Sequence, residues 1–487
     1  MKKRFVIAFC CLTAAVWAQN PFSGGDGSYG QPYQIGSLTD LQYLAAHVAD
    51  YSASTYFLLT TDINCNNATL TPIGSLSHPF YGSFNGGGHT ISHFSISGSD
   101  DQGLFGFIDN GSAVLNVMVS DASVTGLDDV GAVVGHCNQG AVSGCHVVNT
   151  TVHAAGNAYN HGGVVGYNNG GTVSGCISDA AVTKGNCSCQ NCGGVVGNNL
   201  NGACVTNCLY LGATVQGDDN VGAIIGSNTY VAGNCYYTNN AIANAVGASS
   251  VSETNVRLAP QDNKDNTMFL SLLGTVPAAF GPIDLTLYGR TLYTDGYWNT
   301  LCLPFNLTLA GSVLEGAEAR TLTAASFSGD VLRLTFGEPV ETLVAGIPYI
   351  IKWASGSNIV EPSFSGVTID NTNRDFFSAD GNVGFKGAYA AQTFDDEIGN
   401  IRFMGTSNTL NYPLNGASIN AFRAYFQMSG AASAPSHIFF HFEEESPTDW
   451  LNIPASSEGM KLFRNNALYI LKNGVLYDLV GRTITKP

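Results

Sequence analysis

The most regular feature of the chain is a short apolar run closed by glycine, which recurs five times. The closing glycines lie 29, 31, 31 and 29 residues apart. A fixed period of this length is typical of solenoids, in which each coil buries its apolar face only against its neighbours. The five copies are Gly103-Leu-Phe-Gly106, Gly131-Ala-Val-Val-Gly135, Gly163-Val-Val-Gly166, Gly194-Val-Val-Gly197 and Gly222-Ala-Ile-Ile-Gly226.

Each repeat also contains three short β-branched segments separated by glycine and asparagine. In the third repeat these are residues 163–166, 172–174 and 180–183, with a polar turn at 167–170. This spacing is typical of strands joined by tight turns. It predicts one coil of a right-handed parallel β-helix per repeat over residues 98–245. The glycines should let the coils approach closely, so replacing Gly166 by valine should destabilise the array.

The polar and apolar pattern differs on either side of the repeats. Residues 19–97 are predicted to form an N-terminal cap and the first coils. Ser37 precedes a helical pattern that places five apolar residues on one face, and such a helix can cover the open end of a β-stack. Strands are expected at 56–63 and on both sides of the glycine turn within 80–91. The helical face consists of Leu38, Leu41, Leu44, Ala45 and Val48.

Beyond the repeats, residues 246–283 read as a connector with a short helix near 268–273. Residues 284–445 show strand-type alternation at 331–336 and 438–442 without the 30-residue period, which favours an antiparallel β-sandwich. Residues 446–487 form a short tail, in which a Lys-Asn-Gly turn between two apolar runs predicts a hairpin. The expected fold class is therefore all-β.

The N-terminal sequence and the net charge predict a protein that acts outside the cell. Lys2, Lys3 and Arg4 precede an apolar run, and small residues precede Gln19, so residues 1–18 have the pattern of a secretory signal peptide. No later segment is apolar for long enough to span a membrane. The net charge of −17 argues against nucleic acids as partners. We expect a monomer that is secreted or held at the cell surface.

Four cysteines recur at equivalent positions, 9 to 11 residues after a closing glycine. Equivalent residues in successive coils stack at about 4.8 Å, so the favoured interpretation is a ladder of buried thiols, with disulfides between neighbours as the alternative. Eleven cysteines follow the signal segment, which is an odd number, so one at least lacks a partner within the chain. The four are Cys145, Cys176, Cys208 and Cys235.

A second group, Cys187, Cys189 and Cys192, has a denser spacing, and Cys204 follows it. A local disulfide, a metal site and free thiols all remain open for this group. The spacing is not that of paired zinc knuckles, and no matching half exists elsewhere in the sequence.

Acidic pairs recur just before the glycine phrase, and the middle repeats carry asparagines in the same slot. Aspartate and asparagine suit turns intrinsically, so a polar turn ladder is the favoured interpretation. Calcium, which takes oxygen ligands, is the alternative. The slots are Asp100-Asp101, Asp128-Asp129 and Asp218-Asp219, together with Asn157 to Asn160 and Asn186 to Asn191.

Other chemistry-bearing residues give weaker signals. His89 and His93 lie four residues apart, as do His437 and His441, but neither pair has a third ligand nearby in the sequence. Glu443 to Glu445 fit a solvated strand end. The sequence contains neither H-E-x-x-H nor G-x-S-x-G. It therefore assigns no catalytic, cofactor-binding or metal-ligating residue, and no cofactor.

The glycine phrase, with residues 80–91 ahead of it, resembles the GLUG-motif family of bacterial surface proteins, over roughly residues 30–240. Pro32 to Ile35, the predicted helix, Thr61 to Ile63 and Pro72 to Gly74 are similar to the segment that precedes the repeats in that family. One departure is Phe105, where the family usually has leucine or valine. The resemblance implies Gly-rich β-helical repeats and brings no catalytic residues with it.

The C-terminal half shows two further resemblances. Arg290 to Tyr293, Trp298 to Phe305 and Ala421 to Phe426 look like a β-domain of surface proteins from gut-type Gram-negative bacteria. Residues 463–482 are similar to the sorting tail of type IX secretion cargo. Together they imply a non-catalytic, adhesin-like protein at the outer membrane, whose β-helix binds a glycan or a host or matrix protein. A β-helix carbohydrate-active enzyme and a structural spacer are the alternatives.

Overall fold

The computed structural model describes residues 21–328, 331–394, 400–413, 416–429, 435, 437–443, 460–464, 467–472 and 475–478. The predicted signal peptide and Glu444 and Glu445 lie outside these residues. The described chain is almost entirely β, with α1 (Leu38–Ala46) and α2 (Thr267–Leu273) as its α-helices. The all-β prediction is therefore confirmed. Among the described residues, no helix is long and apolar enough to cross a membrane.

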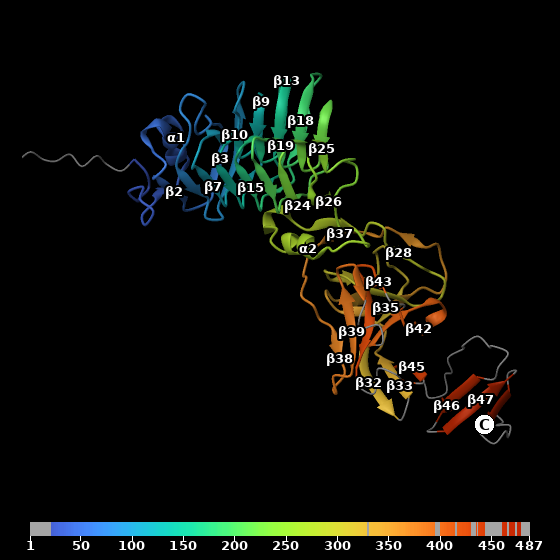
Figure 1. The fold of residues 1–487 in the computed structure, drawn as a ribbon. Helices are drawn as coiled ribbons and strands as arrows, with labels where there is room; N and C mark the ends of the chain where they lie inside the picture. Colours follow the sequence, from blue (N-terminus) through green and yellow to red (C-terminus); the bar gives the residue numbers. More distant parts are fainter. Residues whose placement is uncertain are drawn as a thin grey trace, which may run out of the picture.

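Residues 33–258 form a parallel β-solenoid (Figure 1). One side is a 6-stranded parallel sheet with one strand from each coil, which we call the wall sheet. The register places Val134 opposite Phe105 on one neighbour and Val165 on the other, so the glycine period is the coil period, as predicted. The wall sheet consists of β6 (Phe105–Ile108), β10 (Val134–Asn138), β14 (Val165–Asn169), β19 (Val196–Leu200), β23 (Ile225–Asn228) and β25 (Val246–Ser249).

The other sides of the coils belong to a 20-stranded sheet, whose parallel pairings run on to β26 (Thr254–Leu258). The long strands β9 (Ser123–Gly131) and β13 (Thr151–Gly162) lead into the corner before the wall sheet, where β18 (Cys189–Gly193) and β22 (Asp219–Gly222) stack beside them. In Figure 1, β9, β13 and β18 stand side by side along the upper edge of the stack. We call these strands the corner strands.

Two further files of short strands complete the coils. The first is β7 (Ala113–Leu115), β11 (Ala141–Ser143), β15 (Thr172–Ser174) and β20 (Cys204–Thr206), and the second is β8 (Met118–Ser120), β12 (His146–Val148), β16 (Ile177–Ser178) and β21 (Leu209–Tyr210). Strand β24 (Val231–Tyr237) pairs with the last strand of each file.

Equivalent residues of successive coils fill the interior. Val114, Val142, Val173 and Val205 form one fully buried file from β7 to β20, in register with one another. Because a valine stacks on a valine at each step, the interior buries apolar surface without a globular core. This explains how short runs of three or four apolar residues suffice for a stable fold.

Buried asparagines form a second internal file behind the wall sheet. Asn168 donates from Nδ2 to Asn199 Oδ1 at 2.8 Å, and Asn199 donates likewise to Asn228 Oδ1 at 2.8 Å. The three side chains are at most 1% exposed. A buried amide costs free energy unless it is hydrogen-bonded, so each asparagine depends on those of neighbouring coils.

The predicted capping helix is confirmed. Ser37 is the N-cap of α1, and its hydroxyl accepts a hydrogen bond from Asp40 N at 3.2 Å. Leu41 and Leu44 are buried in the solenoid core. In Figure 1, α1 lies at the N-terminal end of the stack, where it covers strands that would otherwise have open edges.

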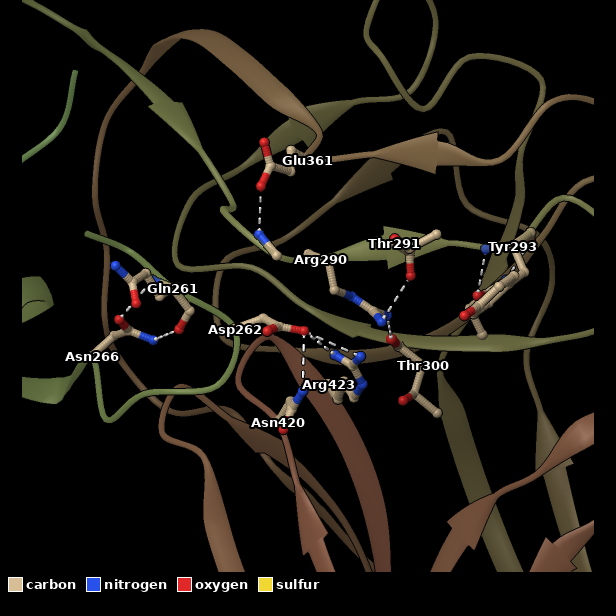
Figure 2. Close-up of polar contacts among 12 residues, drawn as sticks. Gln261, Asp262, Asn266, Arg290, Thr291, Tyr293, Thr300, Glu361, Asn420 and Arg423 are labelled. Atoms are coloured by element: carbon tan, nitrogen blue, oxygen red, sulfur yellow. Dashed lines mark hydrogen bonds and ion pairs between the residues drawn. The ribbon is translucent and has the colours of Figure 1, made fainter. Parts of the chain in front are cut away.

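The predicted connector helix is also present, but the connector begins later than the predicted residue 246, because β25 and β26 still pair with solenoid strands. Phe269 and Leu270 of α2 are buried against the outside of the solenoid, where Phe269 meets Tyr236 of β24 with ring centroids 5.6 Å apart. Asp262, ahead of α2, contacts the C-terminal sheets (Figure 2). Its Oδ2 accepts a hydrogen bond from Asn420 at 3.2 Å and lies 3.4 Å from the Arg423 guanidinium.

The region after the connector is β-rich, but its strands are divided among small sheets, and the predicted two-sheet sandwich is not confirmed. The alternating segments at 331–336 and 438–442 pair with each other in parallel, whereas we expected an antiparallel arrangement. The sheets are β27 (Ile283–Thr286) with β37 (Ser363–Val367); β28 (Thr291–Leu292) with β36 (Ile359–Val360); β29 (Asn299–Cys302), β35 (Pro348–Lys352) and β31 (Glu318–Arg320); β30 (Leu307–Thr308) with β34 (Thr342–Leu343); β32 (Leu322–Ser328), β33 (Val331–Phe336) and β45 (His437–Phe442); β38 (Phe376–Phe377), β39 (Val383–Ala388), β44 (Arg423–Met428), β41 (Ile401–Met404) and β42 (Leu410–Asn411); and β40 (Gln392–Phe394) with β43 (Ala417–Ile419).

The tail contains β46 (Met460–Arg464), β47 (Ala467–Lys472) and β48 (Val475–Asp478), which form an antiparallel sheet. The predicted hairpin is β47 and β48, and its turn at 473–474 lies outside the described residues. Strand β46 was not expected.

Candidate functional site

A groove of about 550 Å³ runs along the solenoid between the wall sheet and the corner strands. Its first side is a file of outward-facing side chains on the wall sheet: Phe107, His136, Tyr167 and Asn198, in register on successive coils. The Phe107 and His136 ring centroids are 4.4 Å apart, and those of His136 and Tyr167 are 4.6 Å apart. We call this file the aromatic file.

The opposite side of the groove is a file of aspartates and asparagines at the ends of the corner strands, which we call the corner file. Asp101, Asp129, Asn160 and Asn191 all adopt the left-handed conformation, with φ between 55 and 61°. Aspartate and asparagine tolerate this conformation better than most residues. Asn160 donates to Asp129 Oδ1 at 2.7 Å and Asn191 donates to Asn160 Oδ1 at 2.8 Å. Asn220 continues the chain by donating to Asn191 Oδ1 at 2.8 Å.

The corner file is the slot that the sequence marked with acidic pairs and asparagines. Its hydrogen bonds and left-handed backbone are what a polar turn ladder requires, so they support that interpretation. Calcium binding stays a prediction. The third acidic pair does not line the groove. Asp218 instead forms an ion pair with Lys184 Nζ at 2.7 Å and accepts a hydrogen bond from Cys189 N at 2.8 Å.

His136 connects the aromatic file to the corner file. Its Nδ1 lies 3.0 Å from Asp129 Oδ2 and 3.4 Å from Asp101 Oδ1. Burial by itself lowers the pKa of His136, but hydrogen bonds and charge from the two aspartates outweigh burial and raise the pKa to about 9. The imidazole is therefore positively charged at neutral pH and partly neutralises the groove.

These three residues are also the group of His, Cys, Asp and Glu in the described chain that could hold a metal ion, since their donor atoms lie within 4.8 Å of one another. The contacts with protonated His136 already account for the positions of Asp101 and Asp129. The same arrangement therefore has an explanation without a metal.

A third row extends the groove toward solvent. Tyr159 lies opposite Asp128 on the neighbouring coil, and its backbone N donates to Asp128 Oδ1 at 2.8 Å. The Tyr159 side chain is 46% exposed and lines the groove. Burial raises the pKa of Asp128, and the nearby Asp100 and Asp129 carboxylates raise it further.

Asn198 connects the two sides of the groove. Its Nδ2 donates to Asn160 Oδ1 at 3.0 Å, whereas its Oδ1 is buried and has no hydrogen-bond partner. The residue is 8% exposed. Because this oxygen is inaccessible from the groove, the contribution of Asn198 is its hydrogen bond to Asn160, which links the aromatic file to the corner file.

The aromatic file was missed in the sequence, although a signal for it exists. Each of its members is the residue directly after the closing glycine of a repeat: Phe107 after Gly106, His136 after Gly135, Tyr167 after Gly166 and Asn198 after Gly197. The signal is weak because these four residues share a position in the repeat but differ in type.

The predicted thiol ladder is confirmed. All four cysteines are fully buried, and each Sγ lies 3.5 to 4.0 Å from a main-chain carbonyl of the preceding coil. The structure holds these cysteines as free thiols. The ladder cysteines are Cys145, Cys176, Cys208 and Cys235.

The second cysteine group does not come together as four ligands. Cys189 and Cys192 lie side by side, with Sγ atoms 2.7 Å apart, whereas Cys187 Sγ faces the Ala154 carbonyl at 3.6 Å. Cys204 lies on β20, in another file of strands. The structure therefore gives no support to a four-cysteine metal site in the described residues.

The histidine pairs have ordinary surroundings. His89 Nδ1 lies 3.3 Å from Asp62 Oδ1, and His93 is a left-handed residue with φ 55°. His437 and His441 lie on β45, at the end of which Glu443 accepts a hydrogen bond from Thr323 at 2.9 Å. Neither histidine pair belongs to a metal-holding group in the part of the chain that the structure describes.

Comparisons with known proteins find partial relatives. No family model matches the chain. "Halomucin" of Haloquadratum walsbyi is 38% identical over 128 residues, which are 23% of this chain and 1% of that protein. The "Putative Gly-rich membrane protein" of Evansella cellulosilytica is 29% identical over 139 residues, which are 25% of this chain and 16% of that protein.

One solved structure, titled as that of "a putative immunoglobulin A1 protease from Bacteroides ovatus", is 21% identical and covers 48% of this chain and 77% of its own. Its TM-score of 0.37 does not establish a common fold. The chain thus shares stretches with two relatives of which it spans only a small part, and these similarities assign it to no family.

Proposed function

We propose that the protein is a non-catalytic binding protein of the cell exterior, and that its solenoid groove binds a neutral glycan. The observation that carries this proposal is the groove itself, in which an aromatic file faces a row of carboxylate and amide oxygens. Aromatic side chains offer flat apolar area with specific geometry, and a few placed polar groups fix a ligand's orientation. A sugar ring presents a matching C–H face and a rim of hydroxyl donors.

The negative charge of the groove determines which classes of glycan it can bind. Asp100, Asp101, Asp128 and Asp129 line the groove, and His136 is the basic residue among the groove lining. The net negative potential would repel sulfated, phosphorylated or uronic-acid ligands. Sugar hydroxyl groups can donate to the groove carboxylates, so a neutral sugar suits the groove best.

The repeat favours an oligosaccharide over a single sugar. Successive coils are spaced by about 4.8 Å, and each adds one member to the aromatic file and one to the corner file. A linear ligand along the groove would therefore meet the same pair of files on several coils. Extended surfaces of this kind are the usual binding faces of solenoid proteins.

Several observations support a location outside the cell. The first 18 residues have the pattern of a secretory signal, and one relative is named as a mucin and another as a membrane protein. We further propose that the repeats belong to the GLUG-motif family and that the tail acts in type IX sorting to a Gram-negative outer membrane. The protein would act there as a monomeric, adhesin-like component.

An array of neutral and anionic glycans, incubated with residues 19–487, tests the proposal. We expect retention on linear neutral glycans, and Tyr167→Ala should weaken it about tenfold, equivalent to 1.4 kcal/mol. Tyr230→Ala is the matched control, because Tyr230 is an exposed solenoid tyrosine outside the groove. Equal binding by wild type and Tyr167→Ala, or retention on anionic glycans alone, would contradict the proposal.

A carbohydrate-active enzyme is the second candidate. Burial raises the pKa of Asp128, and its neighbour Asp129 is ion-paired with His136, so two groove carboxylates lie in different environments. Glycosidases use such a difference to make one carboxyl an acid and the other a base or nucleophile. Release of reducing ends from a bound glycan, abolished in Asp128→Asn, would favour the enzyme. No binding and no release would favour a structural spacer.

A further inference from the structure

Cys189 and Cys192 form a close thiol pair beneath the corner file. Both side chains are fully buried in the solenoid core, with Sγ atoms 2.7 Å apart. In a regular strand, residues three apart point to opposite faces. Asn191, between them, has φ 57°, and this left-handed residue turns the strand so that both thiols reach the interior.

The surroundings of this pair differ from those of the other buried cysteines. The ladder cysteines, such as Cys145 and Cys176, interact with each other across coils and also direct their Sγ atoms to main-chain carbonyls. Cys189 and Cys192 differ because they lie three residues apart in one strand, with their Sγ atoms only 2.7 Å apart. His161 Nδ1 lies 3.7 Å from Cys189 Sγ. The hydrogen bond from Cys192 lowers the pKa of Cys189 to about 5, and His161 adds to this effect.

We propose that Cys189 and Cys192 become joined by a disulfide in the exported protein. The positions of the two side chains favour this bond, because a disulfide of about 2.05 Å needs only a small further approach of the two sulfurs. Extracellular compartments permit such bonds. The proposal does not depend on what the groove binds.

The reaction consumes one disulfide of a small thiol oxidant such as oxidised glutathione. Cys189 thiolate attacks one sulfur of the oxidant, which forms a mixed disulfide and releases one thiolate. Cys192 then loses its proton to solvent or to His161 and attacks Cys189 Sγ, which releases the second thiol. Two protein thiols are oxidised and one oxidant disulfide is reduced to two thiols.

The bond must form before the coil closes, because both sulfurs are inaccessible to solvent in the folded chain. Once formed, it holds the bulge that presents Asn191 to the groove. The neighbouring coils keep the same left-handed corner at Asp129 and Asn160 without cysteines, so the disulfide stabilises the corner and is not required to build it.

Refolding with a measured redox buffer tests the proposal. Residues 19–487 would be reduced in denaturant, refolded with reduced and oxidised glutathione, then denatured again and alkylated without reductant. Tandem mass spectrometry should find Cys189 and Cys192 protected and linked, with a mass about 2 Da below that of the reduced chain. Full alkylation of both residues would overturn the proposal.

Cysteine-to-serine variants identify which two residues form the disulfide. Cys187→Ser is the matched control, because Cys187 lies in the same segment but faces Ala154, and the linkage should persist. Cys189→Ser should leave Cys192 open to alkylation. In wild type, a reductant should lower Tm by a few degrees, and in the double variant Cys189→Ser/Cys192→Ser it should not. A linkage from Cys187 to either residue would also overturn the assignment.

Discussion

His136 is the residue whose charge most directly affects the groove. The structure places a buried imidazole against two carboxylates, and its pKa is raised from 6.5 to about 9. The folded state therefore holds a proton that the unfolded state releases at lower pH. Stability from this proton is complete below about pH 6.5 and is lost as pH rises through about 9.

We expect the Tm of the wild type to fall between about pH 6.5 and 9, with a loss of about 3 kcal/mol across that range. His136→Gln should be less stable at pH 6 and should lose most of this pH dependence. Scanning calorimetry at several pH values measures both. His89→Gln is the control, because its ring contacts one exposed carboxylate. A wild-type Tm that stays level over this range would contradict the assignment.

At the residue scale, sequence reasoning found one side of the groove. The acidic and asparagine slots were visible because aspartate and asparagine stand out in a Gly-rich repeat. The structure places Asp129, Asn160 and Asn191 in one hydrogen-bonded file, with the Asp101 carboxylate beside it near His136. The aromatic file remained hidden, because its members share a position and not a residue type. Only stacking shows that phenylalanine, histidine, tyrosine and asparagine are neighbours there.

At the scale of the element, the glycines decide how closely the coils pack. A Cβ at Gly166 would lie 2.4 Å from Val130 N and 2.7 Å from Gly135 O, both in the neighbouring coil. Backbone atoms held in a parallel sheet cannot move aside as a flexible side chain can. The expectation that glycine is required there for steric reasons agrees with this geometry.

Gly166→Val should therefore destabilise the solenoid by about 3 kcal/mol, the upper end of the range for overpacked sites. The measurement is the urea midpoint of the solenoid transition. Gly185→Ala is the matched control, because a Cβ at Gly185 has no atom within 4 Å and this glycine does not need a positive φ. If both variants unfolded at the same urea concentration, close coil contact would not be the reason for the glycine.

The sequence predicted helices and strands correctly where two independent signals indicated the same element. Helix α1 has the Ser37 cap as well as its apolar face, and the wall strands have the repeat as well as their β-branched residues. It was less successful after residue 283, where alternation indicated strands but not their partners. The parallel pairing of β33 with β45 joins segments about a hundred residues apart, and nothing local specifies it.

At the scale of the whole molecule, the solenoid and the C-terminal sheets are held together by the connector. Asp262 Oδ2 accepts a hydrogen bond from Asn420 Nδ2 and lies close to the Arg423 guanidinium (Figure 2). The backbone carbonyl of Asp262 accepts a hydrogen bond from Ala421 N at 2.6 Å. Arg290 is buried beside them, and burial together with the Arg423 charge lowers its pKa to about 9. The Asp262 carboxylate therefore compensates two arginines.

Asp262→Asn should destabilise the C-terminal region by about 2 kcal/mol, because it leaves the buried Arg290 and the partly buried Arg423 without this counter-charge. The solenoid transition should not change, since each coil is stabilised by its neighbours. Calorimetry with limited proteolysis would separate the two transitions. Asp295→Asn is the control, because Asp295 accepts a hydrogen bond from Tyr297 N within its own turn. Equal effects of both variants would mean that Asp262 does not hold the two parts together.

The sequence by itself determined the parallel β-solenoid as far as residue 245, because a solenoid needs only contacts between equivalent residues one period apart, and the spacing of the glycines gives that period. It did not show that β25 and β26, which lie in the predicted connector, belong to the solenoid. The same period determined the buried thiol ladder, whereas the Ser37 cap and the apolar face determined the helix α1. The tertiary structure decided which outward residues meet across the groove, how His136 acquires its charge, which two cysteines come together, and how the C-terminal strands pair. These depend on left-handed corners, stacking between coils and long-range pairings, and a linear pattern does not encode such distances.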